Sequence, residues 1–313
     1  MKRYLVTGGA GFIGSHIVRG LLEQGAFVRV LDNFSSGKRE NLEGLQDSKN
    51  GSRFEALEGD VRDASKVAEA VRDIEIIFHE AAFVSVPESM EKPQDCFDVN
   101  ITGTSTLFEA ARKAGVRRAV IASSAAVYGD SDALPLLEDT PLRPMSPYAV
   151  SKRVDEMYAA LYTQSFGLEV TALRYFNVYG PRQRPDSMYA AAVPIFIRRL
   201  RDGKPVTIFG DGGQTRDLIF VGDVVRANLM ASEHPAAAGQ VFNICTGAET
   251  RILDLVNVLY ELFPKTPKPV FDVPRAGDIY KSLGCPDKAD SLIGFKAQTS
   301  LAIGLKETVE WMQ

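Results

Sequence analysis

The sequence has little cysteine: only Cys96, Cys245 and Cys285 occur in 313 residues, and no C-x-x-C pair is present. An odd number of widely spaced cysteines argues against a disulfide framework and against a zinc site, and it favours a reducing compartment. Long hydrophobic runs are also lacking. No stretch approaches 18 apolar residues, and the first one, residues 4–6, is too short for the core of a signal peptide. We therefore expect a soluble, cytoplasmic protein with neither a membrane partner nor a metal.

An excess of basic residues is missing as well. The chain has 36 Lys and Arg against 40 Asp and Glu, a formal net charge of −4, so we expect no nucleic-acid partner. An anionic small molecule would have to be held by locally placed arginines. With 45% hydrophobic and 24% charged residues, the chain has the composition of a globular protein with one large domain, or one plus a smaller companion.

Short β-branched runs alternate with amphipathic segments over the first two-thirds of the chain. Strands are predicted at residues 3–7, 27–31, 53–58, 74–79, 119–123 and 168–174. Helices are predicted at residues 15–23, 65–71, 103–114 and 148–166. This alternation, with strands that are almost continuously apolar, predicts a doubly wound α/β fold with a parallel sheet covered on both faces, the Rossmann class.

The pattern changes after about Asn177, where proline and glycine become frequent and the elements shorten. We therefore predict a dinucleotide-binding domain at residues 1–176 and a smaller, mixed α/β, mainly substrate-binding domain at residues 177–313. A further apolar run at residues 238–244 is expected to return to the large sheet.

A glycine cluster, Thr7-Gly8-Gly9-Ala10-Gly11-Phe12-Ile13-Gly14, follows the first predicted strand and opens a helix. Glycines at this place permit a tight turn and let the backbone approach a pyrophosphate, which the helix N-terminus can bind. Asp32 ends the second strand, where a carboxylate accepts hydrogen bonds from the adenosine ribose and repels a 2′-phosphate. The motif predicts dinucleotide binding with NAD favoured over NADP, although the nearby Lys38 and Arg39 are a mild argument for NADP.

Three further residues form a candidate catalytic set. Tyr148 and Lys152 are four residues apart, so they share one face of a predicted helix. A tyrosine is ordinarily a poor base at neutral pH, and a neighbouring ammonium makes it a better one by stabilising the phenolate. Ser124 ends the fifth strand, and ligands bind at the carboxyl ends of strands in such sheets.

Taken together, these motifs resemble the extended short-chain dehydrogenases/reductases of the NAD-dependent epimerase/dehydratase family, over almost the whole chain. Four more segments support the resemblance: His79-Glu80-Ala81-Ala82, Asn100-Ile101-Thr102-Gly103-Thr104, Arg174-Tyr175-Phe176-Asn177-Val178-Tyr179-Gly180-Pro181 and Thr215-Arg216-Asp217.

The resemblance implies that Ser124, Tyr148 and Lys152 are catalytic. The implied NAD contacts are Gly8, Gly11, Phe12, Ile13, Gly14, Asp32, Asn33, Ser36, Gly37, Asp60, Val61, Ala81, Ala82, Asn100, Tyr148, Lys152 and Tyr175. The implied contacts to a UDP-sugar are Ser85, Ser124, Ala125, Tyr148, Asn177, Gln183, Val193, Thr207, Phe209, Arg216, Arg275, Asp278 and Ser282. Within that set, Arg216 and Arg275 would grip the diphosphate, Asp278 would contact the uridine ribose and Phe209 would pack against uracil.

Within the family, 4,6-dehydratases resemble S-T-D-E-V-Y-G at the catalytic serine, and UDP-glucuronate decarboxylases resemble S-T-S-E-V-Y-G. Here Ala125 and Ala126 stand at the variable places. Alanine can neither donate nor accept a proton, which disfavours elimination and leaves C4 epimerisation of a UDP-hexose. In that reaction Tyr148 takes the 4-hydroxyl proton, a 4-keto sugar forms, and tightly bound NAD is regenerated in each turnover.

Two features bear on the sugar. Ser282 falls where UDP-galactose 4-epimerases carry a gating residue, and a serine there leaves room for an N-acetyl group. The segment Tyr189-Ala190-Ala191-Ala192-Val193-Pro194 also resembles epimerases that accept N-acetylhexosamines. The expected substrates are therefore UDP-Glc and UDP-Gal, together with UDP-GlcNAc and UDP-GalNAc.

Three alternatives stay open at this point. The segment Gly180-Pro181-Arg182-Gln183-Arg184-Pro185-Asp186 also resembles UDP-glucuronate 4-epimerases, in which Arg184 would meet the sugar carboxylate. A net NAD-dependent sugar-nucleotide dehydrogenase or reductase would instead exchange its cofactor with solvent. A non-catalytic member of the fold would be expected to lack Tyr148 or Lys152. The family resemblance also suggests a homodimer in which residues 93–114 and 148–166 of each chain build a four-helix bundle.

Overall fold

The computed structural model describes residues 1–45, 51–185, 191–263, 268–274 and 279–312. Its centre is a seven-stranded sheet in the order β11-β6-β5-β4-β1-β2-β3, and every neighbouring pair is parallel. The strands are β1 (Arg3–Thr7), β2 (Phe27–Asp32), β3 (Phe54–Glu58), β4 (Ile76–His79), β5 (Arg118–Ser124), β6 (Glu169–Tyr175) and β11 (Val241–Ile244). The order reverses between β1 and β4, and the crevice beyond the carboxyl ends of those two strands is where such sheets bind ligands.

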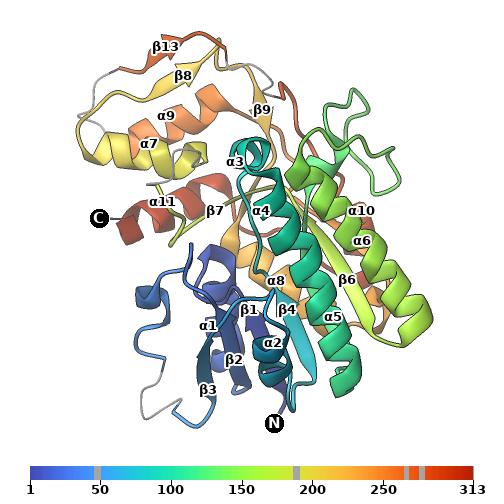
Figure 1. Ribbon diagram of the computed structural model, residues 1–313. Helices are drawn as coiled ribbons and strands as arrows, with labels where there is room; N and C mark the ends of the chain where they lie inside the picture. The colour runs from blue at the N-terminus through green and yellow to red at the C-terminus, as the bar shows by residue number, and fades with distance from the viewer. Residues whose placement is uncertain (46–50, 186–190, 264–267, 275–278, 313) are drawn as a thin grey trace.

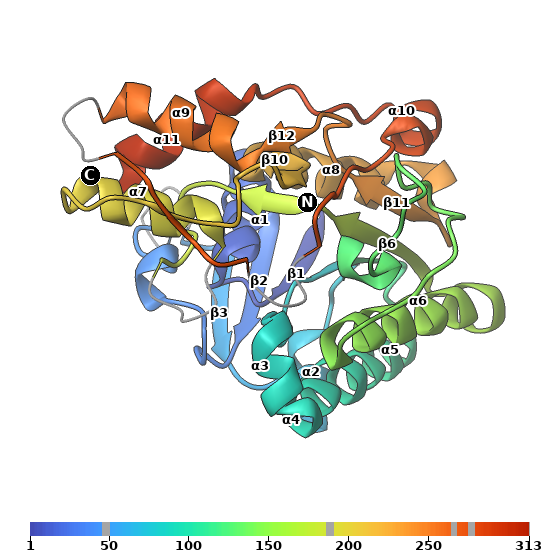
Figure 2. The ribbon, with the colours of Figure 1, turned by 90° about the horizontal axis from the view of Figure 1, so that it is seen from above.

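Helices cover both faces of this sheet (Figures 1 and 2), which confirms the predicted doubly wound class. One face carries α2 (Ala64–Ala70), α5 (Gly103–Ala114) and α6 (Pro147–Phe166). The other carries α1 (Phe12–Glu23), α8 (Val221–Glu233) and α10 (Asp287–Ile293).

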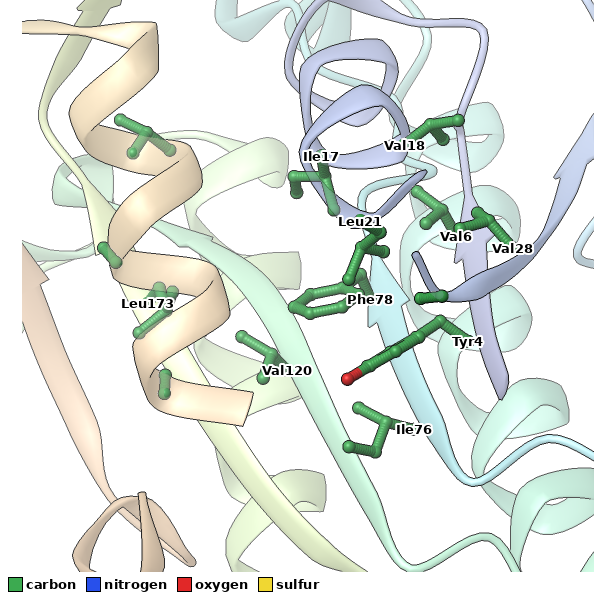
Figure 3. Packing of buried hydrophobic residues seen from close by; sticks show 14 of the residues in the cluster. Tyr4, Val6, Ile17, Val18, Leu21, Val28, Ile76, Phe78, Val120 and Leu173 are labelled. Carbon is green, nitrogen blue, oxygen red and sulfur yellow. The ribbon is translucent and has the colours of Figure 1, made fainter. Parts of the chain in front are cut away.

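The strands are apolar on both sides because each face of the sheet packs against a helix layer. In the layer drawn in Figure 3, Ile17 and Leu21 of α1 pack with Val6 of β1 and Phe78 of β4, and all four are fully buried. A second cluster, which includes Phe108 of α5, fills the opposite face. The cofactor-binding crevice therefore rests on a sheet that packing holds from both sides.

Short elements after residue 177 build a separate layer over one end of the sheet (Figure 1). Three two-stranded ribbons pair β7 (Asn177–Tyr179) with β10 (Leu218–Phe220), β9 (Thr215–Arg216) with β12 (Thr250–Arg251), and β8 (Thr207–Phe209) with β13 (Val270–Asp272). The helices α7 (Ala192–Arg201), α9 (Ile252–Leu262) and α11 (Leu301–Met312) pack around an apolar cluster of their own. Because β11 lies beyond residue 177 and still pairs with β6, the chain returns to the large sheet after building part of this layer. The division at residue 177 itself stays a prediction.

The segment at residues 93–114, predicted as one of the two dimer helices, is not a uniform helix. It consists of α4 (Pro93–Phe97), a π-helical turn (Asp98–Thr102) and α5, and it follows the short helix α3 (Val86–Glu91). A π turn adds a residue within a helix, which sequence periodicity does not reveal, and such turns are frequent at functional sites.

Helix α1 also differs from its prediction. It begins at Phe12, three residues before its predicted start, so the glycine turn leads directly into it. Among the described helices, none has the length and apolar content needed to cross a membrane.

Candidate active site

The glycine turn lies at the reversal point of the sheet. The Gly8 N–H donates to the Leu31 carbonyl at 2.8 Å, and the Gly11 N–H donates to the Gly8 carbonyl at 3.0 Å. A Cβ on Gly14 would lie 2.2 Å from the Gly8 oxygen, and one on Gly8, which has φ +68°, would lie 2.6 Å from the Ala81 nitrogen. Side chains are thus excluded at these positions.

Helix α1 starts directly after this turn. Its N-cap is Gly11, which has no side chain to cap the first-turn N–H groups. Those N–H groups and the close approach that glycine permits fit a pyrophosphate. Phe12 and Ile13, two of the predicted cofactor contacts, are the first two residues of the helix.

Asp32 lies at the carboxyl end of β2, and only 6% of it is exposed. Its carboxylate accepts the Ala10 N–H at 2.9 Å and the Phe34 N–H at 2.8 Å, while burial raises its pKa. A Cβ on Gly37 would lie 2.9 Å from both Asp32 carboxylate oxygens, so glycine keeps the space beside them open. The site therefore fits an adenosine ribose, whose hydroxyls can donate to a carboxylate.

The surroundings of Asp32 also bear on the choice between NAD and NADP. Asn33 Nδ2 donates to Asp60 Oδ2 at 2.8 Å, and Arg62 forms an ion pair with the same carboxylate at 2.8 Å, which holds the pKa of Asp60 well below its usual range. The Arg39 guanidinium pairs with Glu58 at 2.7 Å. This pairing weakens the argument that Arg39 serves a 2′-phosphate.

Two predicted cofactor residues have side chains that are already engaged. Val61 is 4% exposed and packs into the core under α5. Asn100, in the π-helical turn, uses Oδ1 to accept the Phe83 N–H at 2.7 Å, and its Nδ2 donates to the Phe83 carbonyl at 3.1 Å and to Ser151 Oγ at 2.8 Å. A cofactor contact by either residue stays a prediction. The side chain of Asn100 is already hydrogen-bonded to the main chain of Phe83.

The three candidate catalytic residues come from two elements that pack on each other. Ser124 ends β5, and its Oγ accepts the Ala126 N–H at 3.1 Å. Tyr148 and Lys152 lie in the first turns of α6, which contacts β5 and the 3-10 turn after it (Ala125–Tyr128). Lys152 is 3% exposed and pairs with Asp155 at 3.5 Å. The site therefore holds a hydroxyl, a phenol and a buried ammonium near the carboxyl edge of the sheet.

A carboxyl group that is not among the predicted site residues, that of Glu80, lies beside this set. Tyr175 Oη donates to Glu80 Oε1 at 2.8 Å and accepts from Asn228 Nδ2 at 2.8 Å. Burial raises the pKa of Glu80 to about 7, although the Tyr175 hydrogen bond and the positive charge of Lys152 oppose the increase. Glu80 directly follows β4 and precedes the predicted cofactor residues Ala81 and Ala82.

A cavity of about 680 Å³ lies within the C-terminal layer, lined by residues of β7, β8, β9, α7 and α9. Five predicted substrate residues line it: Asn177, Val193, Thr207, Phe209 and Arg216. The predicted contacts Ser85, Ser124, Ala125, Tyr148, Gln183 and Ser282 are not among its lining residues, and Arg275 and Asp278 lie outside the described residues, as do Tyr189 and Ala190.

A short stretch of chain nevertheless links the cavity to the strand partner of Ser124, the predicted catalytic serine. In the sheet register Ser124 pairs with Tyr175, and Asn177, two residues further along, already lines the cavity. The Arg216 side chain reaches the same space from β9. The strand that neighbours Ser124 thus leads directly into the cavity lining.

The sequence also missed Gln214, which lines the cavity and is 9% exposed. Its Nε2 donates to the Phe209 carbonyl at 2.7 Å, while its Oε1 has no hydrogen-bond partner within the part of the chain that the structure describes. In the sequence, Gln214 precedes the segment Thr215-Arg216-Asp217, but no motif marks Gln214 itself as a site residue. No cluster of three metal-ligating side chains occurs among the described residues.

Comparison with known proteins gives a consistent result. The profile of the NAD-dependent epimerase/dehydratase family matches residues 4–245. A UDP-glucose 4-epimerase of Mycolicibacterium smegmatis is 42% identical over 99% of this chain and 98% of its own length. A UDP-glucuronate 4-epimerase of Thermodesulfobacterium geofontis is 33% identical over 99% of this chain and 96% of its own length.

Solved structures agree. The UDP-glucose 4-epimerase of Thermotoga maritima, determined with UDP-glucose, matches with a TM-score of 0.92 and 40% identity over 99% of this chain and 98% of that one. A UDP-N-acetylglucosamine 4-epimerase of Methanobrevibacter ruminantium, in complex with UDP-N-acetylmuramic acid, matches with a TM-score of 0.94 and 36% identity at the same coverage. The UDP-glucose 4-epimerase of Thermus thermophilus in complex with NAD matches with a TM-score of 0.88 and 38% identity, again over 99% and 98% of the two chains.

The raised pKa of Glu80 predicts a pH effect on stability. Between its ordinary value of 4.5 and about 7, the folded chain keeps a proton on Glu80 that the unfolded chain releases, so this group lowers stability as the pH rises through that range. Glu80→Gln, which mimics the protonated form, should therefore gain thermal stability over the wild type as the pH is raised from about 5 to about 8. Melting temperatures across this range measure the gain. Glu40→Gln, at an exposed glutamate, is the control, and a Glu80→Gln difference that stays constant with pH would contradict the assignment.

Proposed function

The chain belongs to the NAD-dependent epimerase/dehydratase family, whose cofactor is NAD, and from this premise we propose that it interconverts the C4 epimers of a UDP-hexose. One observation carries the proposal. Ser124 ends its strand beside Tyr175, and the chain that continues from Tyr175 lines a 680 Å³ cavity together with Arg216. A planar guanidinium suits the oxygens of a diphosphate, which would leave the attached hexose next to the catalytic set.

The glycine turn, the first turn of α1 and the Asp32 carboxylate all fit a dinucleotide and would hold the cofactor. Bound NAD supplies the hydride acceptor of the first half-reaction and the hydride donor of the second. Because the cofactor ends each turnover in its starting state, we expect it to stay bound throughout.

Proton transfer belongs to the protein. Tyr148 accepts the proton of the sugar 4-hydroxyl and returns it when the epimer forms, and the ammonium of Lys152 one turn away stabilises the phenolate. Ser124 Oγ already accepts a hydrogen bond from the Ala126 N–H. The hydroxyl proton of Ser124 can therefore be donated to the sugar oxygen. The 4-keto sugar turns over between the two half-reactions, so that opposite faces of C4 react.

Elimination is the main competing chemistry in this family. Ala125 and Ala126 open the 3-10 turn directly after Ser124, where they present methyl groups instead of an acid and a base. A carbon–oxygen bond at C6 therefore has no proton donor from these two positions. This favours epimerisation.

The proposed sugars are UDP-Glc and UDP-Gal together with their N-acetylated counterparts. Ser282 lies in a segment that bridges Thr215 through Lys281 and Leu136 through Gly284. That segment connects the ribbon of Arg216 with the loop after the proposed catalytic serine, and we propose that the small side chain of Ser282 leaves room there for an N-acetyl group.

UDP-glucuronate is the second candidate substrate, and the glucuronate 4-epimerase relative supports it. It ranks lower because Arg184, the residue expected to meet a carboxylate, donates from Nη1 to the Ser36 carbonyl at 3.1 Å, on the cofactor side. A net dehydrogenase is the third candidate, and it differs in exchanging NAD with solvent.

We also propose a homodimer through α4, α5 and α6, in the cytoplasm. Val150, Met157 and Leu161 recur at helical spacing along α6 and, with Phe97 of α4 and Phe166, are 44–57% exposed. Such a stripe on paired helices suits a bundle with a second copy. The three cysteines are buried and unpaired, which suits a reducing compartment.

The function is tested with UDP-Gal, UDP-GalNAc and UDP-GlcA, each incubated with the purified protein without added NAD and followed by NMR. Wild type should form the C4 epimer of the first two, and Tyr148→Phe should lose about 10²–10⁴-fold in rate because the general base is gone. Both proteins should retain the same amount of bound NAD. Near-normal turnover by Tyr148→Phe, or stoichiometric release of NADH, would reject the proposed mechanism.

The sugar assignment predicts a selective effect at Ser282. Ser282→Tyr should reduce kcat/KM for UDP-GalNAc by at least about tenfold through steric exclusion of the N-acetyl group, with UDP-Gal nearly unaffected. Steady-state kinetics on the two substrates measure the ratio. Equal losses for both would show that the residue does not select the sugar.

The dimer is tested at the same stripe. Leu161→Glu buries a charge in the proposed interface, so light scattering should report the mass of one chain in place of two. Ile303→Glu, at another exposed apolar residue, serves as the control and should keep the mass of the wild type. A wild-type protein that is already monomeric would rule the bundle out.

A further inference from the structure

The main chain of Tyr148 is held from outside its own helix. Tyr148 is the second residue of α6, and its N–H is one of the first-turn donors that have no partner within a helix. That N–H is accepted at 3.2 Å by Ser89 Oγ, from a residue 59 positions away. Ser89 is fully buried in α3, and its own O–H donates to the Val86 carbonyl at 2.6 Å.

The N-terminus of α6 is already capped by a residue other than Ser89. The local N-cap residue Ser146 already accepts the Ala149 N–H at 3.1 Å, as serine does at most helix starts. Ser89 satisfies a second donor from a different segment. What this contact adds is a fixed position of Tyr148 relative to α3.

The carbonyl of Tyr148 is tied to the same segment. Ser151 Oγ donates to it at 2.8 Å and accepts Asn100 Nδ2 at 2.8 Å. Asn100 in turn holds both the N–H and the carbonyl of Phe83. Asn100 and Ser151 are each 1% exposed, so these bonds are shielded from water.

Residues 83–89 are thus bonded to both ends of the Tyr148 residue, through Ser89 on one side and through Asn100 and Ser151 on the other. The same stretch carries Ser85, the N-cap of α3, whose Oγ accepts the Glu88 N–H at 3.2 Å. Ser85 is a proposed sugar contact. Residues 83–89, which carry this proposed sugar contact, and the proposed base Tyr148 are therefore joined in one hydrogen-bonded unit.

We propose that Ser89, Asn100 and Ser151 form a positioning clamp that holds the Tyr148 phenol in register with the segment that carries Ser85. The inference rests on the proposed function, because it acts through Tyr148 as the base. None of the three residues needs to touch the substrate. Their effect is on the distance and angle at which the phenol meets the 4-hydroxyl, and misplacement of about 1 Å can cost on the order of 10²-fold in rate.

The test removes one hydroxyl. Ser89→Ala should lower kcat for UDP-Gal by about 10- to 100-fold while KM stays within about twofold and bound NAD is unchanged. Thr163→Val is a matched control at the far end of α6, because Thr163 Oγ1 also donates to a carbonyl, that of Ala159, and accepts an N–H, that of Val170, both at 2.9 Å. This control should lose comparable thermal stability and keep kcat.

A double-mutant cycle separates positioning from general damage. In the Tyr148→Phe background, Ser89→Ala should change the residual turnover by less than about twofold, since no phenol remains to be placed. An equal loss in both backgrounds, or a wild-type kcat for Ser89→Ala, would overturn the clamp while leaving the proposed function intact. If Tyr148→Phe is itself fully active, the proposed function fails and the clamp fails with it.

Ser151→Ala provides a second variant that keeps the test decisive if Ser89→Ala does not fold. It breaks the link between Asn100 and Tyr148 and should give the same split, a reduced kcat with an unchanged KM. An unchanged kcat for Ser151→Ala under those conditions would count against the clamp.

Discussion

The buried ion pair between Arg174 and Glu156 joins the sheet to the helix that carries the proposed base. Arg174 Nε and Nη2 each donate to a Glu156 oxygen at 2.8 Å, and both side chains are at most 2% exposed. Ser123 Oγ donates to the same carboxylate at 2.6 Å, so β5, β6 and α6 meet at one charge. Loss of one partner of such a pair costs roughly 3–5 kcal/mol, because the other charge is left buried without compensation.

The position of the candidate active site follows from that contact. Glu156 lies one turn after Lys152 and two turns after Tyr148 on α6, while Ser123 is adjacent to Ser124. Arg174 Nη1 also donates to Tyr128 Oη, which donates to Asn243 on β11 at 2.6 Å. Because a buried charge accepts few alternative geometries, α6 has little freedom to slide along the sheet, and the clamp around Tyr148 refines a position that the ion pair has already limited.

The sequence predicted those features that depend on a local chemical requirement. The glycine turn needs residues without a side chain, as the 2.2 Å clash at Gly14 illustrates, and Asp32 needs only to follow a strand. Apolar strands that alternate with helices predicted the class of the large sheet, a doubly wound parallel one. Features that join distant segments left no such signal. Ser89 meets Tyr148 across 59 positions, the π-helical turn that aims Asn100 at Phe83 interrupts an ordinary helical pattern, and Glu80 becomes distinctive only when Tyr175 is placed beside it.

The same distinction explains why the cofactor was easier to identify than the sugar. Epimerisation, as proposed, requires the cofactor to remain fixed while the sugar turns over, so the two ligands need different kinds of site. The glycine turn and Asp32 of the proposed dinucleotide site follow two adjacent strands of the large sheet, β1 and β2. The cavity, in contrast, is assembled from separate segments after residue 177, with Arg216 on one ribbon and Phe209 on another. A grip on the nucleotide end leaves the hexose attached through a flexible diphosphate, free to present either face to Tyr148. Under the proposed function, selection among sugars would depend on the packing of a few side chains such as Ser282, where the space left by a single small group is decisive.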